Sequence, residues 1–402
     1  MRRVMRIGAA LPALATLLVG LAGCATPSHE QAKNAAVNRW QSARSGISYG
    51  QALQQFEVGD LEKAEKTINR TLEAMPGNGR YRVLAARIAL EQNKLERAYR
   101  HLEIAVEVEP ELAPAHYYIG VVHQRWQQLD AALASYEKAA EHDPESVAGL
   151  LAAAEMLVTL DRADEAIERL EDKLVYFEHN AAVRLTLGRV LFKVGQTERA
   201  ISIFHDAYVL APDDPAALEQ LAMVEYAAGK FGDAMRHLRD LTRREGMADR
   251  RDLRMALGDC YLQTGAPVHA RKVFLELTES EEASTEAWIA LGEVAYVLGD
   301  LRQLDRAGRR VATLAPERPE GHLLRGLAAE REGRLDEAAA RFGDAAGAAP
   351  EEATPWMMRG AALERLGRVD DARRAYERAR RLSPEDPRIA RLLAGLTDND
   401  TR

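Results

Sequence analysis

The chain has 402 residues, of which 29% are charged and only 6% are aromatic, and its formal net charge is −8. The negative balance argues against general binding of nucleic acid, which requires a basic surface. Few aromatic residues and many small ones favour closely packed helices over a sheet protein.

The N-terminus has the pattern of an export signal. Arginines at positions 2, 3 and 6 precede an apolar stretch from 7 to 23 that is short for a membrane-spanning helix. The stretch leads into Leu21-Ala22-Gly23-Cys24, which resembles the lipobox of bacterial lipoproteins. In that family the cysteine is diacylated and becomes the mature N-terminus. An ordinary cleaved signal and a weak membrane anchor remain alternatives.

The resemblance implies a location as well as an anchor. Ala25 follows Cys24, and because Asp at that place favours inner-membrane retention in Gram-negative lipoproteins, the outer membrane is implied. Several acyl chains together would make the anchor stable, and the body would lie in the periplasm. We predict a signal peptide at 1–23 and a lipidated cysteine with a tether at 24–44, helical from Glu30 to Arg44.

A period of 34 residues runs through most of the chain. Gly or Ala occupies the eighth position of every unit, and Ala occupies the twentieth position in all but one. Such a period is typical of stacked helical hairpins, in which each unit buries its apolar face against its neighbours. The ten units are 45–78, 79–112, 113–146, 147–180, 181–214, 215–248, 251–284, 285–318, 319–352 and 353–386.

These units resemble tetratricopeptide repeats, a family that pairs two antiparallel helices in each repeat. The resemblance implies an all-α fold: a right-handed superhelical solenoid of about ten helix-turn-helix repeats, whose surface holds other molecules. Repeat five reads Leu187-Gly188, Ala200, Phe204, Ala207 and Pro212 at positions 7, 8, 20, 24, 27 and 32.

The repeat pattern has a physical basis. Small residues at positions 8, 20 and 27 let the helices approach closely, and the large residue at position 24 fills the space that they leave. Glycine near position 15 permits a tight turn after the first helix, and proline at position 32 stops the second. Units four, six and eight depart from the pattern, at Lys173, Glu178, Leu241, Gly246, Leu304 and Gly308.

Two extra residues, Asp249 and Arg250, follow the sixth unit. We therefore divide the array into repeats one to six at 45–248 and repeats seven to ten at 249–386. The stretch 242–250 is a candidate bend or hinge, and a longer loop without a mechanical role is the alternative. Residues 387–402 are predicted to form a capping helix and a tail, with a polar outer face.

The sequence contains no phosphate loop, dinucleotide fingerprint, metalloprotease helix or calcium loop. His116 and His123 share a predicted helix but occupy packing positions, so we predict no metal site. If Cys24 is acylated, Cys260 has no disulfide partner, and its small buried position favours an inert thiol over a functional one. We therefore predict no enzyme and no cofactor.

In this family, positions 2, 5, 9, 12 and 13 of each first helix tend to line a concave groove. The resemblance therefore implies a groove that is basic in repeats two to five and acidic in repeats six to eight, with aromatic residues along it. Such a surface suits an extended peptide or a helix, although ordinary solvated charge explains the same residues. The groove residues are Arg80, Arg87, Tyr117, Arg125, Arg189, Lys193, Tyr226, Asp259, Glu293 and Tyr296, together with Glu219, Asp252 and Glu286.

These features predict a protein anchored to the outer membrane that acts in the periplasm as a non-catalytic scaffold. Its partners would be envelope proteins or peptides of a pilus, secretion or cell-wall machinery, with no role for nucleic acid. A component of exopolysaccharide synthesis or export, with groove aromatics stacking on sugars, is the alternative. An enzyme of unrecognised type is a third hypothesis, and the sequence indicates no oligomeric state.

Overall fold

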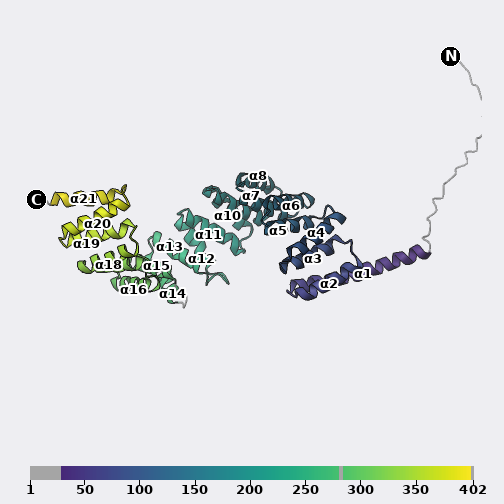
Figure 1. Cartoon of the computed structure of the whole chain (residues 1–402), viewed down its shortest axis with the longest axis horizontal. Helices are drawn as coiled ribbons and strands as arrows, with labels where there is room; N and C mark the ends of the chain where they lie inside the picture. Colours follow the sequence, from purple (N-terminus) through teal and green to yellow (C-terminus); the bar gives the residue numbers. More distant parts are fainter. Residues whose placement is uncertain (1–28, 280–283, 400–402) are drawn as a thin grey trace, which may run out of the picture. The chain divides into compact units, whose positions relative to one another are not determined.

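The computed structural model describes residues 29–279 and 284–399, and within those ranges all regular secondary structure is helical. The helices follow one another along the chain as short antiparallel hairpins (Figure 1). Their bounds are α1 His29–Glu57, α2 Leu61–Ala74, α3 Gly79–Glu91, α4 Leu95–Val108, α5 Ala113–Arg125, α6 Leu129–His142, α7 Val147–Thr159, α8 Ala163–Leu174, α9 Ala181–Lys193, α10 Thr197–Leu210, α11 Pro215–Ala227, α12 Phe231–Leu241, α13 Arg251–Gln263, α14 Pro267–Glu279, α15 Thr285–Leu298, α16 Leu301–Leu314, α17 Glu320–Arg331, α18 Leu335–Ala348, α19 Ala353–Arg365, α20 Val369–Leu382 and α21 Pro387–Asn399.

The helices follow the predicted register. Each of the ten 34-residue units holds two of the helices from α1 to α20, and α21 packs against α20 after the last unit. The predicted all-α solenoid of about ten helix-turn-helix repeats is therefore confirmed. α21 occupies the segment for which the sequence predicts a capping helix, and it buries Ile389 and Leu396 while leaving Arg388 and Arg391 exposed.

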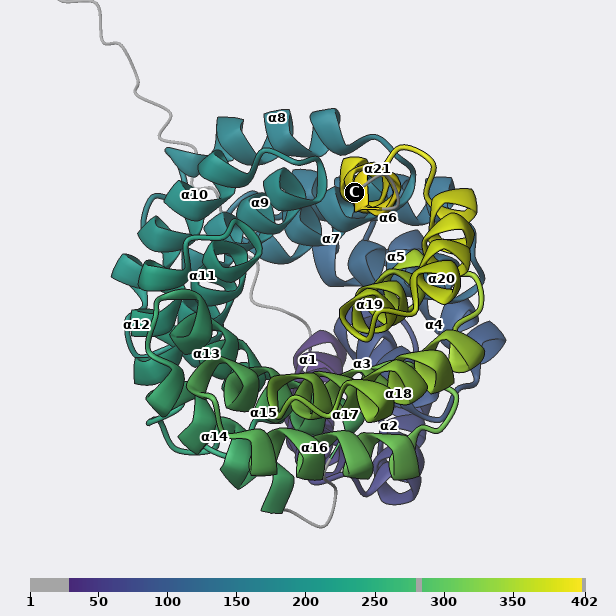
Figure 2. The ribbon, with the colours of Figure 1, turned by 90° about the vertical axis from the view of Figure 1, so that its left-hand side faces the viewer.

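The chain divides into two compact units, one ending at Gly149 and the other beginning at Leu150, with the boundary inside α7. Unit one contains α1 to α6, in which α1, α3 and α5 contact one another in succession. In unit two the odd-numbered helices from α9 to α19 lie on the inner side of a curve and the even-numbered ones on its outer side (Figure 2). The division predicted from the insertion at 249 is a different one, and it stays a prediction.

Position 15 of every repeat turns the chain between the two helices in a left-handed conformation. Seven of the ten residues are glycines with φ between 71° and 80°. The other three are Asn93, Gln127 and Asp161, with φ of 56°, 61° and 59°. Asn and Asp adopt this conformation more readily than other residues with a side chain. Gln127 has no such preference, so the packing of the helices on either side must impose the turn there.

Positions 8 and 24 pack against each other in matched pairs. Where position 8 is glycine, an aromatic ring lies over it, as Phe204 does over Gly188, where an added Cβ would be 2.6 Å from the ring. Repeats three, five, seven, nine and ten have this pairing. Where position 8 is alanine, position 24 is the smaller Ile68, Leu102, Leu170 or Leu238, all fully buried. The ring therefore fills the space left by the missing methyl group, as the sequence pattern predicts.

Repeat eight is the exception, because both positions are glycine. An added Cβ on Gly292 would be 2.7 Å from Leu324, and one on Gly308 would be 2.6 Å from Arg325. Both of these side chains belong to α17 of the next repeat. Glycine in place of a large residue at position 308 thus lets α17 approach α16 closely. Leu324 of the next repeat then fills the space over Gly292 that a ring fills elsewhere.

The junction at 242–250 is tied to its neighbours by polar contacts. Arg244 donates a hydrogen bond to the Pro212 carbonyl at 2.8 Å, and Arg250 bridges two carboxylates described below. Met247 packs against the core formed by α11, α12 and α13. These contacts favour a fixed, longer loop over a hinge.

The N-terminal part of α1 runs without a break into the first repeat, so residues 29–44 are helical. Cys24, Ala25 and the predicted signal lie outside the described residues. Within the described ranges, no helix combines the length and the apolar character needed to cross a membrane.

Candidate functional site: the first-helix face

The predicted groove residues lie on the first helices of the repeats, and we call the surface that these helices form in each unit its first-helix face. Unit one carries Arg80, Arg87, Tyr117 and Arg125. Unit two carries the other nine predicted residues.

On unit one, Arg87 is held between two aromatic rings. Its guanidinium carbon lies 4.7 Å from the ring centroid of Phe56 on α1 and 5.7 Å from that of Tyr118 on α5. Tyr117 packs edge-on against Tyr118, with ring centroids 5.3 Å apart. Cation–π contacts of this kind stabilise the stacking of adjacent repeats. Arg87 is therefore engaged within the protein and is not a free charge in a groove.

Arg80 and Arg125 are both exposed, and Arg125 also has a contact within unit one. Its Nη1 donates a hydrogen bond at 2.9 Å to the carbonyl of Leu90, which lies in the last turn of α3 in the preceding repeat. This contact joins the C-terminal end of α3 to the next repeat. Fewer basic side chains of unit one are therefore free to bind a partner than the sequence predicts.

The basic residues of unit two have similar internal partners. Arg189 lies 3.5 Å from Glu155 and 3.1 Å from the Thr186 hydroxyl. Lys193 donates a hydrogen bond to the Val158 carbonyl at 3.3 Å. Both residues remain exposed, so each contact is weak and a ligand could compete for it.

Three of the predicted groove acids are neutralised by arginines that the groove positions do not include. Arg250 lies 2.8 Å from Glu219 and 2.7 Å from Asp252, and its hydrogen bonds hold the pKa of Asp252 below the usual value. Arg318 lies 2.9 Å from Glu286 and 2.8 Å from Glu320. Fewer of the predicted acidic side chains therefore remain without a basic partner than the sequence indicates. In the sequence, Arg250 and Arg318 each lie just before a first helix. Their acidic partners lie up to 31 and 32 residues away, so these ion pairs could not be predicted from the local sequence.

Asp259 and Glu293 differ from these acids, and we call them the acidic pair. They occupy position 9 of successive repeats, on α13 and α15, and no basic side chain among the described residues pairs with either. Burial raises the pKa of the Asp259 carboxyl, and loss of hydration together with the Asp259 charge raises the pKa of Glu293. Asp259 is partly buried and Glu293 is exposed, so a negative charge without a cation is the more costly at Asp259.

The acidic pair lies among aromatic and apolar side chains. The Tyr226 hydroxyl donates a hydrogen bond to Asp259 at 2.9 Å, and burial with this contact raises the pKa of Tyr226 to about 12. Tyr296, one turn from Glu293, is covered by Arg331, whose guanidinium carbon is 4.5 Å from the ring centroid. The half-buried neighbours on these helices are Met223, Met255, Leu262 and Ile289.

The histidines and the second cysteine have structural surroundings. His116 lies 2.7 Å from the Pro110 carbonyl, and His123 lies 2.7 Å from the Gln128 side chain. Cys260 is fully buried, and burial raises its pKa to about 11, which keeps the thiol protonated and unreactive. Over the described ranges, no set of three or more His, Cys, Asp or Glu side chains is placed to hold a metal ion.

Comparison with known families identifies the repeats. One tetratricopeptide repeat model matches residues 49–107, 119–183, 219–284, 323–387 and 357–396, and a second matches 161–217. The chain belongs to the tetratricopeptide repeat family. Proteins of this family are generally non-catalytic scaffolds for protein–protein interaction, and the repeats of this chain offer the corresponding first-helix faces.

Individual relatives are distant. Tetratricopeptide repeat protein 8 of Caenorhabditis elegans is 22% identical over 185 residues, which are 46% of this chain and 36% of the relative. The chain thus spans about a third of the length of this curated relative.

Two solved structures resemble parts of the chain. A tetratricopeptide repeat protein from Parabacteroides merdae is 15% identical, covers 62% of this chain and 98% of its own, and has a TM-score of 0.42. The pilF protein of Pseudomonas aeruginosa is 20% identical, covers 52% of this chain and 94% of its own, and has the same TM-score of 0.42.

Proposed function

We propose that this chain is a non-catalytic adaptor, anchored to the outer membrane through Cys24, that binds an envelope protein or peptide in the periplasm. Family membership supports the scaffold role, and the lipobox-like sequence followed by Ala25 supports the anchor and its location. The partner belongs to an envelope assembly such as a pilus, secretion or cell-wall machinery.

The acidic pair is the observation that carries the binding proposal. Asp259 and Glu293 lie near each other without a basic partner among the described residues, and apolar and aromatic side chains surround them. A lysine or arginine of a partner would restore the missing countercharge, and apolar partner residues beside it would contact Met255 and Ile289. The preferred partner segment is therefore basic with flanking apolar residues.

The contacts of the aromatic side chains favour a protein over a polysaccharide. Arg87 covers Phe56, and Arg331 covers Tyr296, so these rings are already occupied on one face. Tyr226 uses its hydroxyl to bind Asp259. Stacking on sugars thus has less support than pairing with a basic peptide.

Crosslinking in cells tests the groove. We expect the protein with Asp259→Asn and Glu293→Gln to lose the partner that the unaltered protein captures. The matched control changes Glu219→Gln and Asp252→Asn, which removes the same charge from residues that Arg250 already pairs. Loss of the partner in both variants, or in neither, contradicts the role of the acidic pair.

The same pair predicts a pH dependence of partner binding. The raised pKa values mean that both carboxyls take up protons at a higher pH than ordinary carboxyls do as the pH falls. Affinity for the captured partner, measured at a series of pH values from 7 downwards, should therefore begin to fall at a higher pH than it would with ordinary carboxylates. The Glu219→Gln, Asp252→Asn variant keeps the acidic pair and should show the same decline.

Fractionation tests the anchor independently. Cys24→Ser should release the protein from membranes, whereas Cys260→Ser should leave it attached. A Cys24→Ser protein that sediments fully with membranes would favour a weak membrane anchor made by the apolar stretch itself.

A further inference from the structure

A pocket of about 520 Å³ lies on unit two and is lined mainly by α16, a helix on the outer side of the curve (Figure 2). Among the described residues, Trp288 of α15 and five residues of α16 line it. Its volume is in the range of small-ligand sites. The α16 residues are Asp305, Arg306, Arg309, Arg310 and Thr313.

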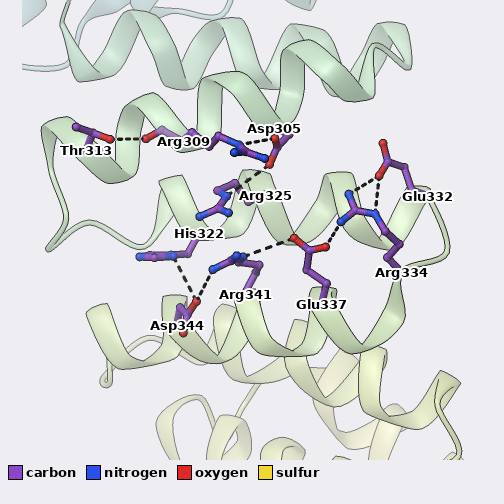
Figure 3. Close-up of polar contacts among 10 residues, drawn as sticks. All are labelled: Asp305, Arg309, Thr313, His322, Arg325, Glu332, Arg334, Glu337, Arg341 and Asp344. Atoms are coloured by element: carbon purple, nitrogen blue, oxygen red, sulfur yellow. Dashed lines mark hydrogen bonds and ion pairs between the residues drawn. The ribbon is translucent and has the colours of Figure 1, made fainter.

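The pocket has a surplus of positive charge in a chain whose net charge is negative. Arg309 is paired with Asp305 at 2.7 Å, and Arg325 of α17 approaches the other oxygen of the same carboxylate at 3.5 Å (Figure 3). Arg306 and Arg310 are exposed and have no acidic partner anywhere in the described ranges. They are four residues apart on one helix, where like charges repel.

One buried polar group on the pocket wall has no partner in the part of the chain that the structure describes. Trp288 is only 7% exposed, and its indole Nε1 is buried without a hydrogen-bond acceptor among the described residues. Trp356, at the same position of repeat ten, donates to the Pro350 carbonyl six residues earlier at 3.4 Å. The corresponding carbonyl for Trp288 belongs to residue 282, which lies outside the described residues.

We propose that this pocket binds a phosphate group, which Arg306, Arg309 and Arg310 hold together. Guanidinium groups match phosphate oxygens with paired hydrogen bonds, and the phosphate would relieve the repulsion between Arg306 and Arg310. Thr313 donates its hydroxyl hydrogen to the Arg309 carbonyl at 2.9 Å, so the arginines are the principal donors. Trp288 offers an apolar surface for the group that carries the phosphate.

The phosphate could be free or esterified to a small molecule, or it could belong to a lipid headgroup. The pocket does not include the acidic pair. This proposal therefore concerns a second ligand and does not depend on the partner proposed above. Titrations of the full chain in non-ionic detergent separate the sources. The probes are inorganic phosphate, glycerol 3-phosphate, and micelles containing either phosphatidylglycerol or phosphatidylcholine.

The decisive variant is Arg306→Gln with Arg310→Gln, which removes two exposed charges that have no acidic partner in the described part of the chain. Its affinity for the bound probe should fall about tenfold or more, as expected when charged hydrogen bonds are lost. The matched control, Arg271→Gln with Arg302→Gln, removes two exposed charges from α14 and α16 outside the pocket and should leave the affinity nearly unchanged.

Saturable binding of the two soluble probes identifies a free phosphate or a small ester, and binding of phosphatidylglycerol micelles alone identifies a headgroup. Equal weakening in both variants would show general charge attraction and overturn the site. So would a failure of all the phosphate probes to bind at millimolar concentration. An acidic peptide that binds the pocket more tightly than any phosphate probe would assign it to carboxylates instead.

Discussion

Repeats seven and eight are neighbours in unit two, but they fill the space over position 8 differently. In repeat seven, the Phe274 ring lies over Gly258 within a single hairpin. In repeat eight, Gly308 stands where the ring would be, and Leu324 of the following repeat covers Gly292. The core of repeat seven is therefore internal to the repeat, whereas that of repeat eight depends on its neighbour.

The difference has an electrostatic consequence. Arg325 occupies position 7 of repeat nine, where this family places leucine, and Gly308 leaves room for it between α16 and α17. Its contact with Asp305 lies beside a second, separate set of ion pairs, in which Arg341 of α18 contacts Glu337 and Asp344 (Figure 3). Burial lowers the pKa of Arg325. A partly buried arginine–carboxylate contact thus lies where other repeats have an aromatic ring.

Removing the ring of repeat seven should have the largest effect. Phe274→Ala leaves a cavity inside a fully buried cluster, and such changes cost about 3–5 kcal/mol. The measurement is the urea midpoint of the full chain, with hydrogen exchange to localise the loss to α13 and α14. The adjacent, partly exposed Leu275 provides the control, because Leu275→Ala should cost much less. Equal losses at the two positions would contradict the internal core of repeat seven.

Restoring the family's ring in repeat eight should destabilise the protein. Gly308→Phe introduces a ring where the Gly321 carbonyl and the Arg325 side chain already lie within 3 Å of an added Cβ. Overpacking of this kind costs about 1–3 kcal/mol. Combining Gly308→Phe with Arg325→Leu should recover part of the loss by removing one of the obstructing side chains. A stabilised single variant, measured by the same denaturation, would show that the glycine is not required by α17.

The repeat pattern predicted most of the fold because its contacts are local. Position 8 and position 24 lie on adjacent antiparallel helices, so Gly258 predicts a large partner such as Phe274 without knowledge of other repeats. The compensation in repeat eight could not be predicted in this way, because Leu324 and Arg325 come from another repeat. The left-handed turn at Gln127 was also missed, since its conformation depends on the flanking helices and not on the residue itself.

The candidate site was less predictable than the fold for the same reason. Position within the repeat placed Asp259 and Asp252 on the same face, but only the structure distinguishes the carboxyl paired with Arg250 from the one that has no cation. Likewise, the position of Arg87 on the first helix gave no indication that two rings enclose it. Side-chain pairing between repeats, and not residue type at a position, decides which charges remain available.

The smallest predicted effect comes from adding one methyl group at position 8 of each repeat, by Gly258→Ala and Gly292→Ala. This pair of substitutions compares the two repeats most directly. Alanine is favoured over glycine in a helix by about 1 kcal/mol, so Gly292→Ala has an intrinsic gain. Its Cβ would be 2.7 Å from the terminal carbon of Leu324, which can rotate away, so the net change should be within about 1 kcal/mol of zero. Gly258→Ala presses the same methyl group against the fully buried Phe274 ring, which has no room to move, and it should cost about 1–3 kcal/mol. Similar midpoints for the two variants would mean that the ring of repeat seven is as adaptable as the leucine of its neighbour.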